Sequence, residues 1–126
     1  MNCYKCSLCQ TRIKFVYSDG NNNADLMFIG EVPGADENLS GKPFVGKAGK
    51  LLRSLFKEVG FNNFYLTNVV KCRPPNNRNS KREEFLACAD FLRDQIKNVK
   101  PKLIVLVGAV ALKFILKNYD SMYKLR

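Results

Sequence analysis

The residues of this chain best suited to chemistry are cysteines with the spacing of metal ligands. Cys3 and Cys6 form a C-x2-C pair, Cys72 follows an apolar segment, and Cys88 comes sixteen positions after it. If the fold brings these places together, four thiolates provide the ligands of either a tetrahedral zinc ion or a 4Fe-4S cluster. The number of ligands does not choose between the two.

Two cysteines have another interpretation. Cys88 falls on the apolar face of a predicted helix, where a free cysteine commonly behaves as a small buried hydrophobe. Cys9 extends the first pair into C-x2-C-x2-C, the opening of a bacterial ferredoxin, but the x3-C-P that completes that run is absent. We therefore do not expect an electron carrier.

A second group of candidate residues lies in a segment rich in glycine and proline, from Gly30 to Gly49. It contains two glutamates, Glu31 and Glu37, and one aromatic ring, Phe44. So many residues that break regular structure predict a long loop rather than a helix or a strand. Because the loop follows a compact apolar run, we expect it at the carboxyl end of a buried strand.

Alternating strands and helices are expected to position these groups. Compact apolar runs predict strands, and apolar residues at helical spacing predict helices. The predicted strands are 25–29, 64–70 and 103–107, and the predicted helices are 48–59, a middle helix beginning near 80, and 109–118. This order predicts an α/β fold, a three-layer α/β/α sandwich with a parallel central sheet and right-handed crossovers. Ligands are expected beyond the carboxyl ends of the strands.

Capping and turn residues set the expected boundaries. Ser80 with Glu83 makes a capping box for the middle helix, which ends near Pro101. Gly60 is expected to cap the first helix at its carboxyl end. Residues 18–23 and 73–79 are rich in asparagine, glycine or proline, so both are expected to be loops.

Composition favours a single basic domain over residues 1–126. The 21 lysines and arginines against 11 acidic residues give a formal charge of +10, which suits a polyanionic partner such as nucleic acid. No apolar run approaches the length that spans a bilayer, and the first residues lack the apolar stretch of a secretion signal. We therefore expect a cytoplasmic, reducing environment, where spaced cysteines indicate a metal more often than disulfides.

Three segments together resemble the iron-sulfur uracil-DNA glycosylases of family 4. The loop from Gly30 to Gly49 looks like the first motif of that family, residues 67–75 (TNVVKCRPP) look like the second, and residues 3–12 look like its amino terminus. The resemblance covers nearly the whole chain. It implies a monomeric DNA repair enzyme that hydrolyses the N-glycosidic bond of uracil in DNA during base excision repair.

The resemblance also assigns the cysteines. In its register the cluster ligands are Cys3, Cys6, Cys72 and Cys88, while Cys9 is a surplus thiol. The resemblance, rather than the number of ligands, selects a 4Fe-4S cluster over zinc.

The same resemblance implies a pocket for a base that has left the DNA stack. Phe44 is the expected stacking platform, with a core phenylalanine as the alternative, and Asn68 is expected to read the amide edge of uracil, with a turn asparagine as the alternative. Glu31 lies where the family positions the catalytic water, and Glu37 lies where the pocket contacts the base, although either could be a solvated loop carboxylate. Gly30 and Val32 belong to the pocket wall, and Val32 replaces a smaller residue usual in the family.

The loop that follows the second strand is expected to contact DNA. Arg73 and Arg78, with Arg82 nearby, are the candidate phosphate ligands, and solvated arginines are the alternative. Backbone N–H groups of the Gly30–Gly49 loop are expected to stabilise the departing uracil anion.

One part of the family pattern is missing from this sequence. The carboxyl-terminal His-Pro-Ser stretch does not occur, the chain has no histidine, and the last strand and helix of the family are not found. We expect a truncated product that excises uracil weakly or not at all. A non-catalytic iron-sulfur nucleic-acid-binding module is the rival interpretation, and a small metal-sensing or redox protein is a third.

Overall fold

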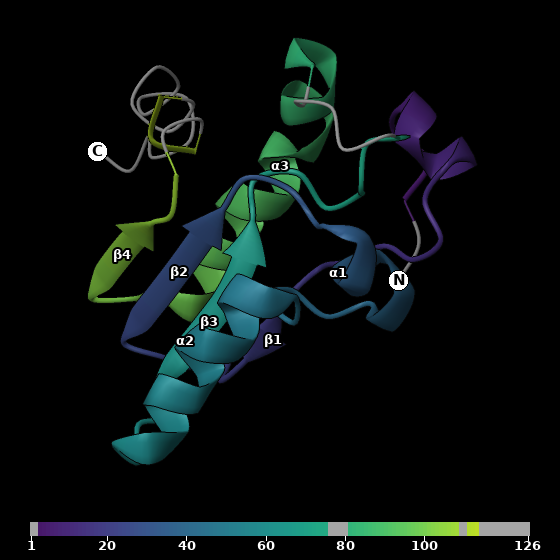
Figure 1. The fold of residues 1–126 in the computed structure, drawn as a ribbon. Helices are drawn as coiled ribbons and strands as arrows, with labels where there is room; N and C mark the ends of the chain where they lie inside the picture. The colour runs from purple at the N-terminus through teal and green to yellow at the C-terminus, as the bar shows by residue number, and fades with distance from the viewer. Residues whose placement is uncertain (1–2, 76–80, 109–110, 114–126) are drawn as a thin grey trace.

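The computed structural model describes residues 3–75, 81–108 and 111–113. Its centre is a four-stranded sheet with the strand order β1-β3-β2-β4 (Figure 1). The strands are β1 (Asp19–Gly20), β2 (Leu26–Gly30), β3 (Phe64–Asn68) and β4 (Leu103–Leu106). The three longer strands occupy positions that the apolar runs predicted.

Parallel pairing aligns the ends of the two central strands. β2 pairs in parallel with β3 and with β4, and its last residue, Gly30, lies opposite the last residue of β3, Asn68. The prediction of a parallel central sheet is confirmed for these three strands. The edge strand β1 was not predicted. It lies within a segment predicted to be a loop, and it pairs antiparallel with β3 through Asp19 and Gly20.

The helices are η1 (Ser7–Gln10), α1 (Ala35–Ser40), α2 (Lys47–Glu58) and α3 (Arg82–Val99). The predictions of α2 and α3 are confirmed. The prediction of an unbroken loop from residue 31 to residue 49 is wrong, because α1 forms within it. The Glu37 carboxylate accepts a hydrogen bond from the N–H of Gly34 at the start of α1, and Gly41 ends the helix with a φ of 80°.

The cap of α3 lies one residue later than predicted. The backbone N–H of Lys81 donates to Oε1 of Glu84 at 2.8 Å, so Glu84 takes the role predicted for Glu83. Ser80 lies outside the described residues. The predicted helix over 109–118 falls mostly outside them too, although residues 111–113 are helical.

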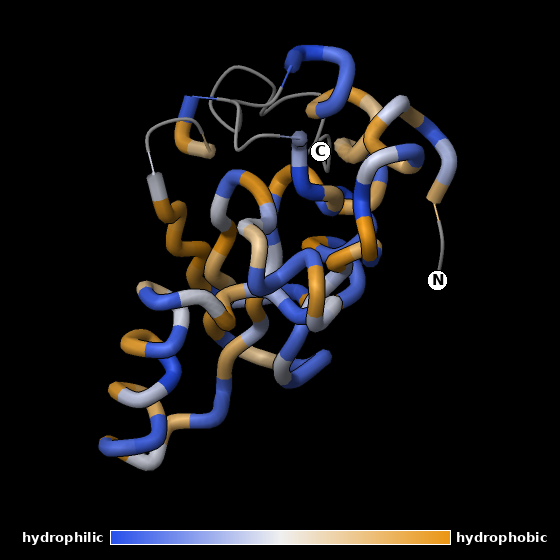
Figure 2. Tube along the Cα trace, turned by 45° about the vertical axis from the view of Figure 1, so that its right-hand side comes forward, coloured by the Kyte–Doolittle hydropathy of each residue, from blue (hydrophilic) through white to orange (hydrophobic). Residues whose placement is uncertain are grey.

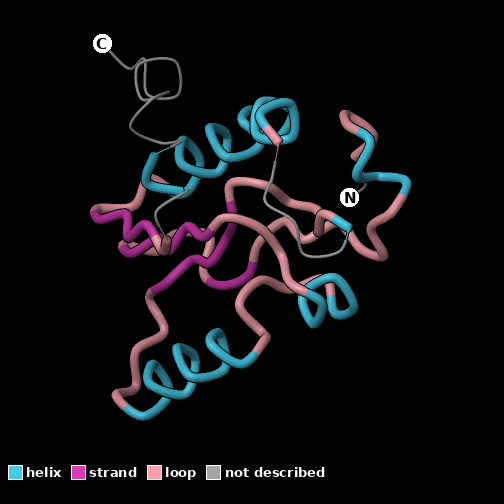
Figure 3. The backbone as a smooth tube through the Cα atoms, turned by 45° about the horizontal axis from the view of Figure 1, so that its top comes forward, coloured by secondary structure: helices cyan, strands magenta, loops and turns pink. Residues whose placement is uncertain are grey.

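The sheet lies between α2 and α3, which gives the expected three layers (Figure 3). Alternate residues of the strands face opposite layers. On one side, Phe28 and Phe64 pack on Phe56 of α2, with ring centroids 5.3 and 4.5 Å apart. On the other side, Met27 and Ile29 are fully buried in the same core as Leu92 of α3. The central strands are largely apolar (Figure 2). In the described part of the chain, no helix is long and apolar enough to cross a membrane.

Candidate functional site

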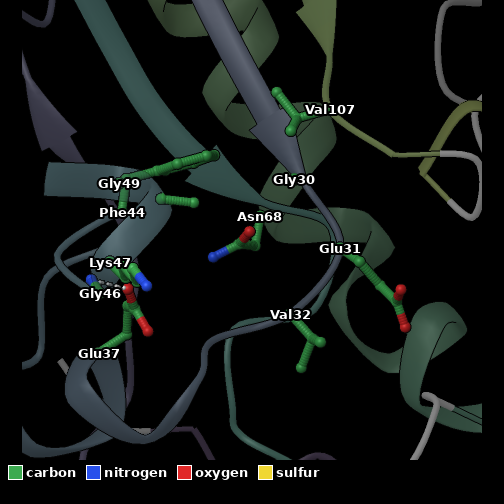
Figure 4. A pocket seen from close by; sticks show the side chains of 11 residues that line it. Gly30, Glu31, Val32, Glu37, Phe44, Gly46, Lys47, Gly49, Asn68 and Val107 are labelled. Carbon is green, nitrogen blue, oxygen red and sulfur yellow. Dashed lines mark hydrogen bonds between the residues drawn. The ribbon is translucent and has the colours of Figure 1, made fainter. Parts of the chain in front are cut away.

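A pocket of about 320 Å³ opens where β2 and β3 end. This is the edge of the sheet at which the sequence predicts a ligand site, and the Gly30–Gly49 loop forms much of its wall (Figure 4). The lining residues come from both strand ends, from the loop and from the start of α2. They are Gly30, Glu31, Val32, Glu37, Phe44, Gly46, Lys47, Ala48, Gly49, Asn68 and Val107.

Gly30 allows two predicted site residues to approach each other. A Cβ atom on Gly30 would lie 2.5 Å from Oδ1 of Asn68 and 3.2 Å from Cζ of Phe44. Only a residue without a side chain leaves room for this arrangement. The register of the sheet therefore brings the amide of Asn68 and the ring of Phe44 together, as the sequence implied.

Asn68 presents a buried polar group to the pocket. The residue is only 5% exposed, and Figure 4 shows its side-chain amide directed toward Phe44 and Lys47. Within the described residues, nothing forms a hydrogen bond with this amide. Buried polar groups in folded proteins nearly always have a partner, so an amide without one points to a ligand.

Phe44 is held in an unusual backbone conformation at the pocket wall. Its φ is +56°, in the left-handed region that non-glycine residues seldom adopt, and its side chain is half-buried rather than part of the core. Arg53 of α2 fixes the segment: Nε donates to the Phe44 carbonyl at 2.8 Å, and Nη2 donates to the Pro43 carbonyl at 2.7 Å. A Cβ atom on Gly49 would lie 2.2 Å from the Phe44 carbonyl carbon, so α2 packs directly on this backbone.

Sequence reasoning missed Arg53 and Lys47. Arg53 also pairs with Asp19 of β1 at 2.9 Å, and because those two residues are far apart in the chain, no local pattern indicates the contact. Lys47 is exposed and lines the pocket at the first residue of α2. Its place within the Gly30–Gly49 motif is the one signal from which it could have been found.

Glu37 binds the loop in which it lies. Its carboxylate accepts hydrogen bonds from the N–H groups of Gly34, Val45 and Gly46, at 3.0, 2.8 and 2.6 Å. Burial acts to raise the pKa of Glu37, but hydrogen bonds from the backbone, led by Gly46, outweigh burial and hold that pKa below its ordinary value. Glu37 is therefore a charged group that fixes the shape of the loop.

Glu31 and Val32 lie on the opposite side of the pocket from Glu37. In Figure 4 the side chain of Glu31 extends away from Asn68, while its backbone carbonyl accepts a hydrogen bond from the N–H of Val70 at 2.9 Å. Val32 is half-buried and packs against the hydrophobic core. Both residues therefore line the pocket without touching the amide of Asn68.

The four predicted cysteine ligands lie near enough to influence one another's pKa, with Cys6 at the start of η1 and Cys88 within α3. Cys3, Cys72 and Cys88 are buried and Cys6 is half-buried. Each of the buried sulfur atoms accepts an N–H hydrogen bond. The donors are Lys5 N to Cys3 at 3.5 Å, Arg12 Nη1 to Cys72 at 3.1 Å, and Lys71 N to Cys88 at 3.5 Å.

The thiols also influence one another's pKa. Burial raises the pKa of Cys88 to about 11; the nearby Lys71 opposes this rise, while Cys72 and Cys6 add to it. Burial likewise raises the pKa of Cys72, with Arg12 acting against it and Cys6 and Cys3 adding to it. Over the described ranges, no three histidine, cysteine or acidic side chains are arranged to hold one metal ion.

The predicted DNA-contacting arginines are placed only in part. Arg73 is half-buried just after β3, and Arg82 is exposed at the first residue of α3. Arg78 lies outside the described residues.

Known proteins resemble this chain over nearly its whole length. The model of the Uracil DNA glycosylase superfamily matches residues 17–125. The type-4 uracil-DNA glycosylase of Archaeoglobus fulgidus is 45% identical over 122 residues, which are 95% of this chain and 61% of that protein. Those of Saccharolobus solfataricus and Sulfurisphaera tokodaii are each 44% identical, over 94% and 100% of this chain and 56% and 60% of theirs. The chain thus spans about three-fifths of the length of these relatives.

Proposed function

Because the chain belongs to the uracil-DNA glycosylase superfamily, we propose that it hydrolyses the N-glycosidic bond of uracil in DNA. The observation that supports this most strongly is the buried amide of Asn68, which has no partner among the described residues and is aimed into the pocket beside Phe44. The three relatives described above carry the same activity in their names.

The pocket chemistry suits uracil. The base presents an N–H between two carbonyl groups, and a side-chain amide can accept from that N–H while it donates to a neighbouring carbonyl. Cytosine carries an amino group where uracil has a carbonyl, so the same amide orientation would place two donors together. Phe44 supplies a ring against which the base stacks. The base reaches this ring when its nucleotide is flipped out of the DNA stack.

We assign the reaction steps to residues of the loop. The bond between the sugar C1′ and uracil N1 breaks, the electron pair leaves with uracil as an anion, and water adds to the oxocarbenium-like sugar. Glu31 positions that water and takes its proton, and backbone N–H groups of the loop stabilise the anion. Glu37 contributes by holding the loop, because its oxygens already accept three backbone N–H groups.

DNA is the proposed partner because of the strong basic charge of the chain. A formal charge of +10 favours binding of the phosphate backbone, which positions a protein on DNA without reading sequence. Arg73 and Arg78 are the proposed phosphate ligands. A monomer and a cytoplasmic location remain predictions.

We further propose that Cys3, Cys6, Cys72 and Cys88 hold a 4Fe-4S cluster. In such a cluster each thiolate binds a different iron, so the four sulfur atoms need not meet around one point, as four zinc ligands must. Burial and N–H donors to sulfur are suited to bound thiolates. When bound, the group would supply a cross-link between the amino-terminal segment, the end of β3 and α3.

The absorption spectrum, iron content and sulfide content of protein purified without oxygen test the cofactor. We expect a coloured protein with about four irons and four sulfides per chain. A colourless protein with one zinc ion would instead establish the zinc alternative.

Release of free uracil from single-stranded DNA tests the activity, with Phe44→Ala and Asn68→Ala as comparison variants. We expect the unmodified chain to release uracil and each variant to lose at least about tenfold in rate, since each removes one contact to the base. DNA binding without uracil release, unchanged by either substitution, would instead support the non-catalytic binding module.

A further inference from the structure

Lys71 places an amino group in the interior of the protein, close to the proposed base-binding residue. The residue is fully buried and follows Asn68 by three positions. Its Nζ atom donates to Oγ1 of Thr67 at 2.7 Å, to Oε1 of Gln95 at 2.7 Å and to the backbone carbonyl of Asn68. These three acceptors use all three N–H donors of the ammonium group.

Stability alone does not explain a buried lysine at this position. The acceptors around Nζ are a hydroxyl, an amide oxygen and a carbonyl, and the structure gives Lys71 no ion pair with a described carboxylate. Removing an amino group from water is costly, and neutral acceptors offset that cost less than an opposite charge does. A role other than stability is therefore the better explanation of a lysine at this position.

Lys71 contacts the carbonyl of Asn68, the residue at which β3 ends, and so holds the backbone there in place. Asn68 forms the last pair of β3, opposite Gly30. Beyond it, the N–H groups of Val69 and Val70 donate to the carbonyls of Gly30 and Glu31, both at 2.9 Å. These bonds hold the chain on the β2 side, and Lys71 holds the Asn68 peptide on the α3 side.

The group that anchors Lys71 is itself fixed. Gln95 of α3 accepts from Lys71 through Oε1, and its Nε2 donates to the Tyr17 carbonyl at 3.0 Å and to Oη of Tyr65 at 3.1 Å. Two helical turns of α3 separate Gln95 from Cys88. The position of the Asn68 peptide is therefore tied to α3 through side chains that have defined partners.

We propose that Lys71 is a positioning residue for uracil recognition, which it serves by holding the Asn68 peptide so that the side-chain amide stays aimed into the pocket. Lys71 touches neither the base nor the sugar. The inference rests on the proposed function, because it presumes that Asn68 reads the base.

The test compares unmodified protein with Lys71→Met, which keeps the length of the side chain and removes the three donors. The readout is the ratio of dissociation constants for two single-stranded oligonucleotides that differ only in one uracil or cytosine, since only uracil matches the donor and acceptor of the Asn68 amide. We expect Lys71→Met to reduce the preference for uracil about tenfold while its affinity for the cytosine oligonucleotide stays unchanged.

Leu92→Ala is the matched control, since Leu92 is fully buried on the same helix as Gln95 and forms none of these hydrogen bonds. Leu92→Ala should lower the unfolding midpoint of the protein but leave its preference for the uracil oligonucleotide unchanged. If Lys71→Met lowered the unfolding midpoint but kept the preference for uracil, the role of Lys71 would be purely structural and the inference would be overturned.

Hydrogen exchange of the Asn68–Val70 amides separates this inference from the proposed function. We expect faster exchange there in Lys71→Met, with exchange in α2 unchanged, whether or not the protein prefers uracil. Unchanged exchange at Asn68–Val70 overturns the inference by itself. An unmodified protein that shows no preference for uracil refutes the proposed function, and with it the link between Lys71 and base recognition.

Discussion

At the scale of single residues, the pocket depends on how closely Asn68 and Phe44 approach Gly30. The polar end of Asn68 and the ring of Phe44 both occupy space that a side chain at position 30 would fill. The arrangement provides one amide and one ring for a planar base, and each contact can be altered separately.

Gly30→Ala should impair recognition of uracil more than it impairs folding. The new Cβ would lie 2.5 Å from Oδ1 of Asn68, and a flexible side chain can move aside at modest cost in stability. We expect the preference for uracil over cytosine to fall about tenfold. Equilibrium binding of the two oligonucleotides measures this.

Gly60→Ala is the control for that prediction. Gly60 has a φ of 71° and open space around it, so alanine there strains the backbone by about 1–2 kcal/mol far from the pocket. It should change stability and leave the preference intact. A Gly30→Ala protein with full preference would contradict the proposed geometry.

Glu37→Gln should destabilise the protein at neutral pH and much less in acid. The pKa of Glu37 is held below its ordinary value of 4.5, so its contribution to stability is present above 4.5 and is lost as pH falls through the lower folded value. Glutamine has one acceptor oxygen for three backbone donors, and we expect a loss of about 1 kcal/mol at pH 7.

Urea unfolding of both proteins at neutral pH and well below pH 4.5 measures the difference in free energy of unfolding. The difference between the two proteins should narrow as the pH falls. An equal difference at both pH values would show that the charge of Glu37 does not hold the loop.

At the scale of secondary structure, patterns predicted the long elements and missed the short ones. The strands β2, β3 and β4 and the helices α2 and α3 each have a run or period long enough to recognise. β1 has two residues and forms because β3 offers it a partner, which no local pattern records. α1 lies among glycines and prolines that obscure its pattern, and a hydrogen bond from the Gly34 N–H to the Glu37 carboxylate helps to begin it.

The packing of α2 against the loop gives a prediction at this scale. Arg53→Met keeps an unbranched side chain but removes both donors to the Pro43 and Phe44 carbonyls. Phe44 would no longer be held at a φ of +56°, so we expect several-fold weaker preference for uracil and about 1–3 kcal/mol lower stability. Binding of the paired oligonucleotides and urea unfolding measure the two effects.

Lys57→Met is the matched control on the same helix, because Lys57 is exposed and its side chain forms no hydrogen bond or ion pair with the described residues. Lys57→Met should change neither the preference for uracil nor the free energy of unfolding appreciably. If Arg53→Met behaved like Lys57→Met, α2 would not fix the position of Phe44.

At the scale of the whole molecule, the sequence indicated which residues meet but not how they are held. Parallel pairing of two apolar runs was enough to bring the Gly30–Gly49 loop beside Asn68. Cys72 and Cys88 each lie near other members of the predicted ligand set, and the set itself stays a prediction. The supports of these sites could not be predicted in the same way. Arg53 and Lys71 act through partners distant in the chain, and a single sequence does not show such contacts.

The central claim is that the pocket beside Gly30, Phe44 and Asn68 receives uracil, and binding tests it most directly because binding does not depend on turnover. The measurement is the affinity of the unmodified chain and of Asn68→Ala for two single-stranded oligonucleotides that differ only in one uracil or cytosine, because cytosine does not match the Asn68 amide. We predict that the unmodified chain binds the uracil oligonucleotide at least about tenfold more tightly and that Asn68→Ala loses this preference. Equal affinities for both oligonucleotides, unchanged by Asn68→Ala, would contradict the claim.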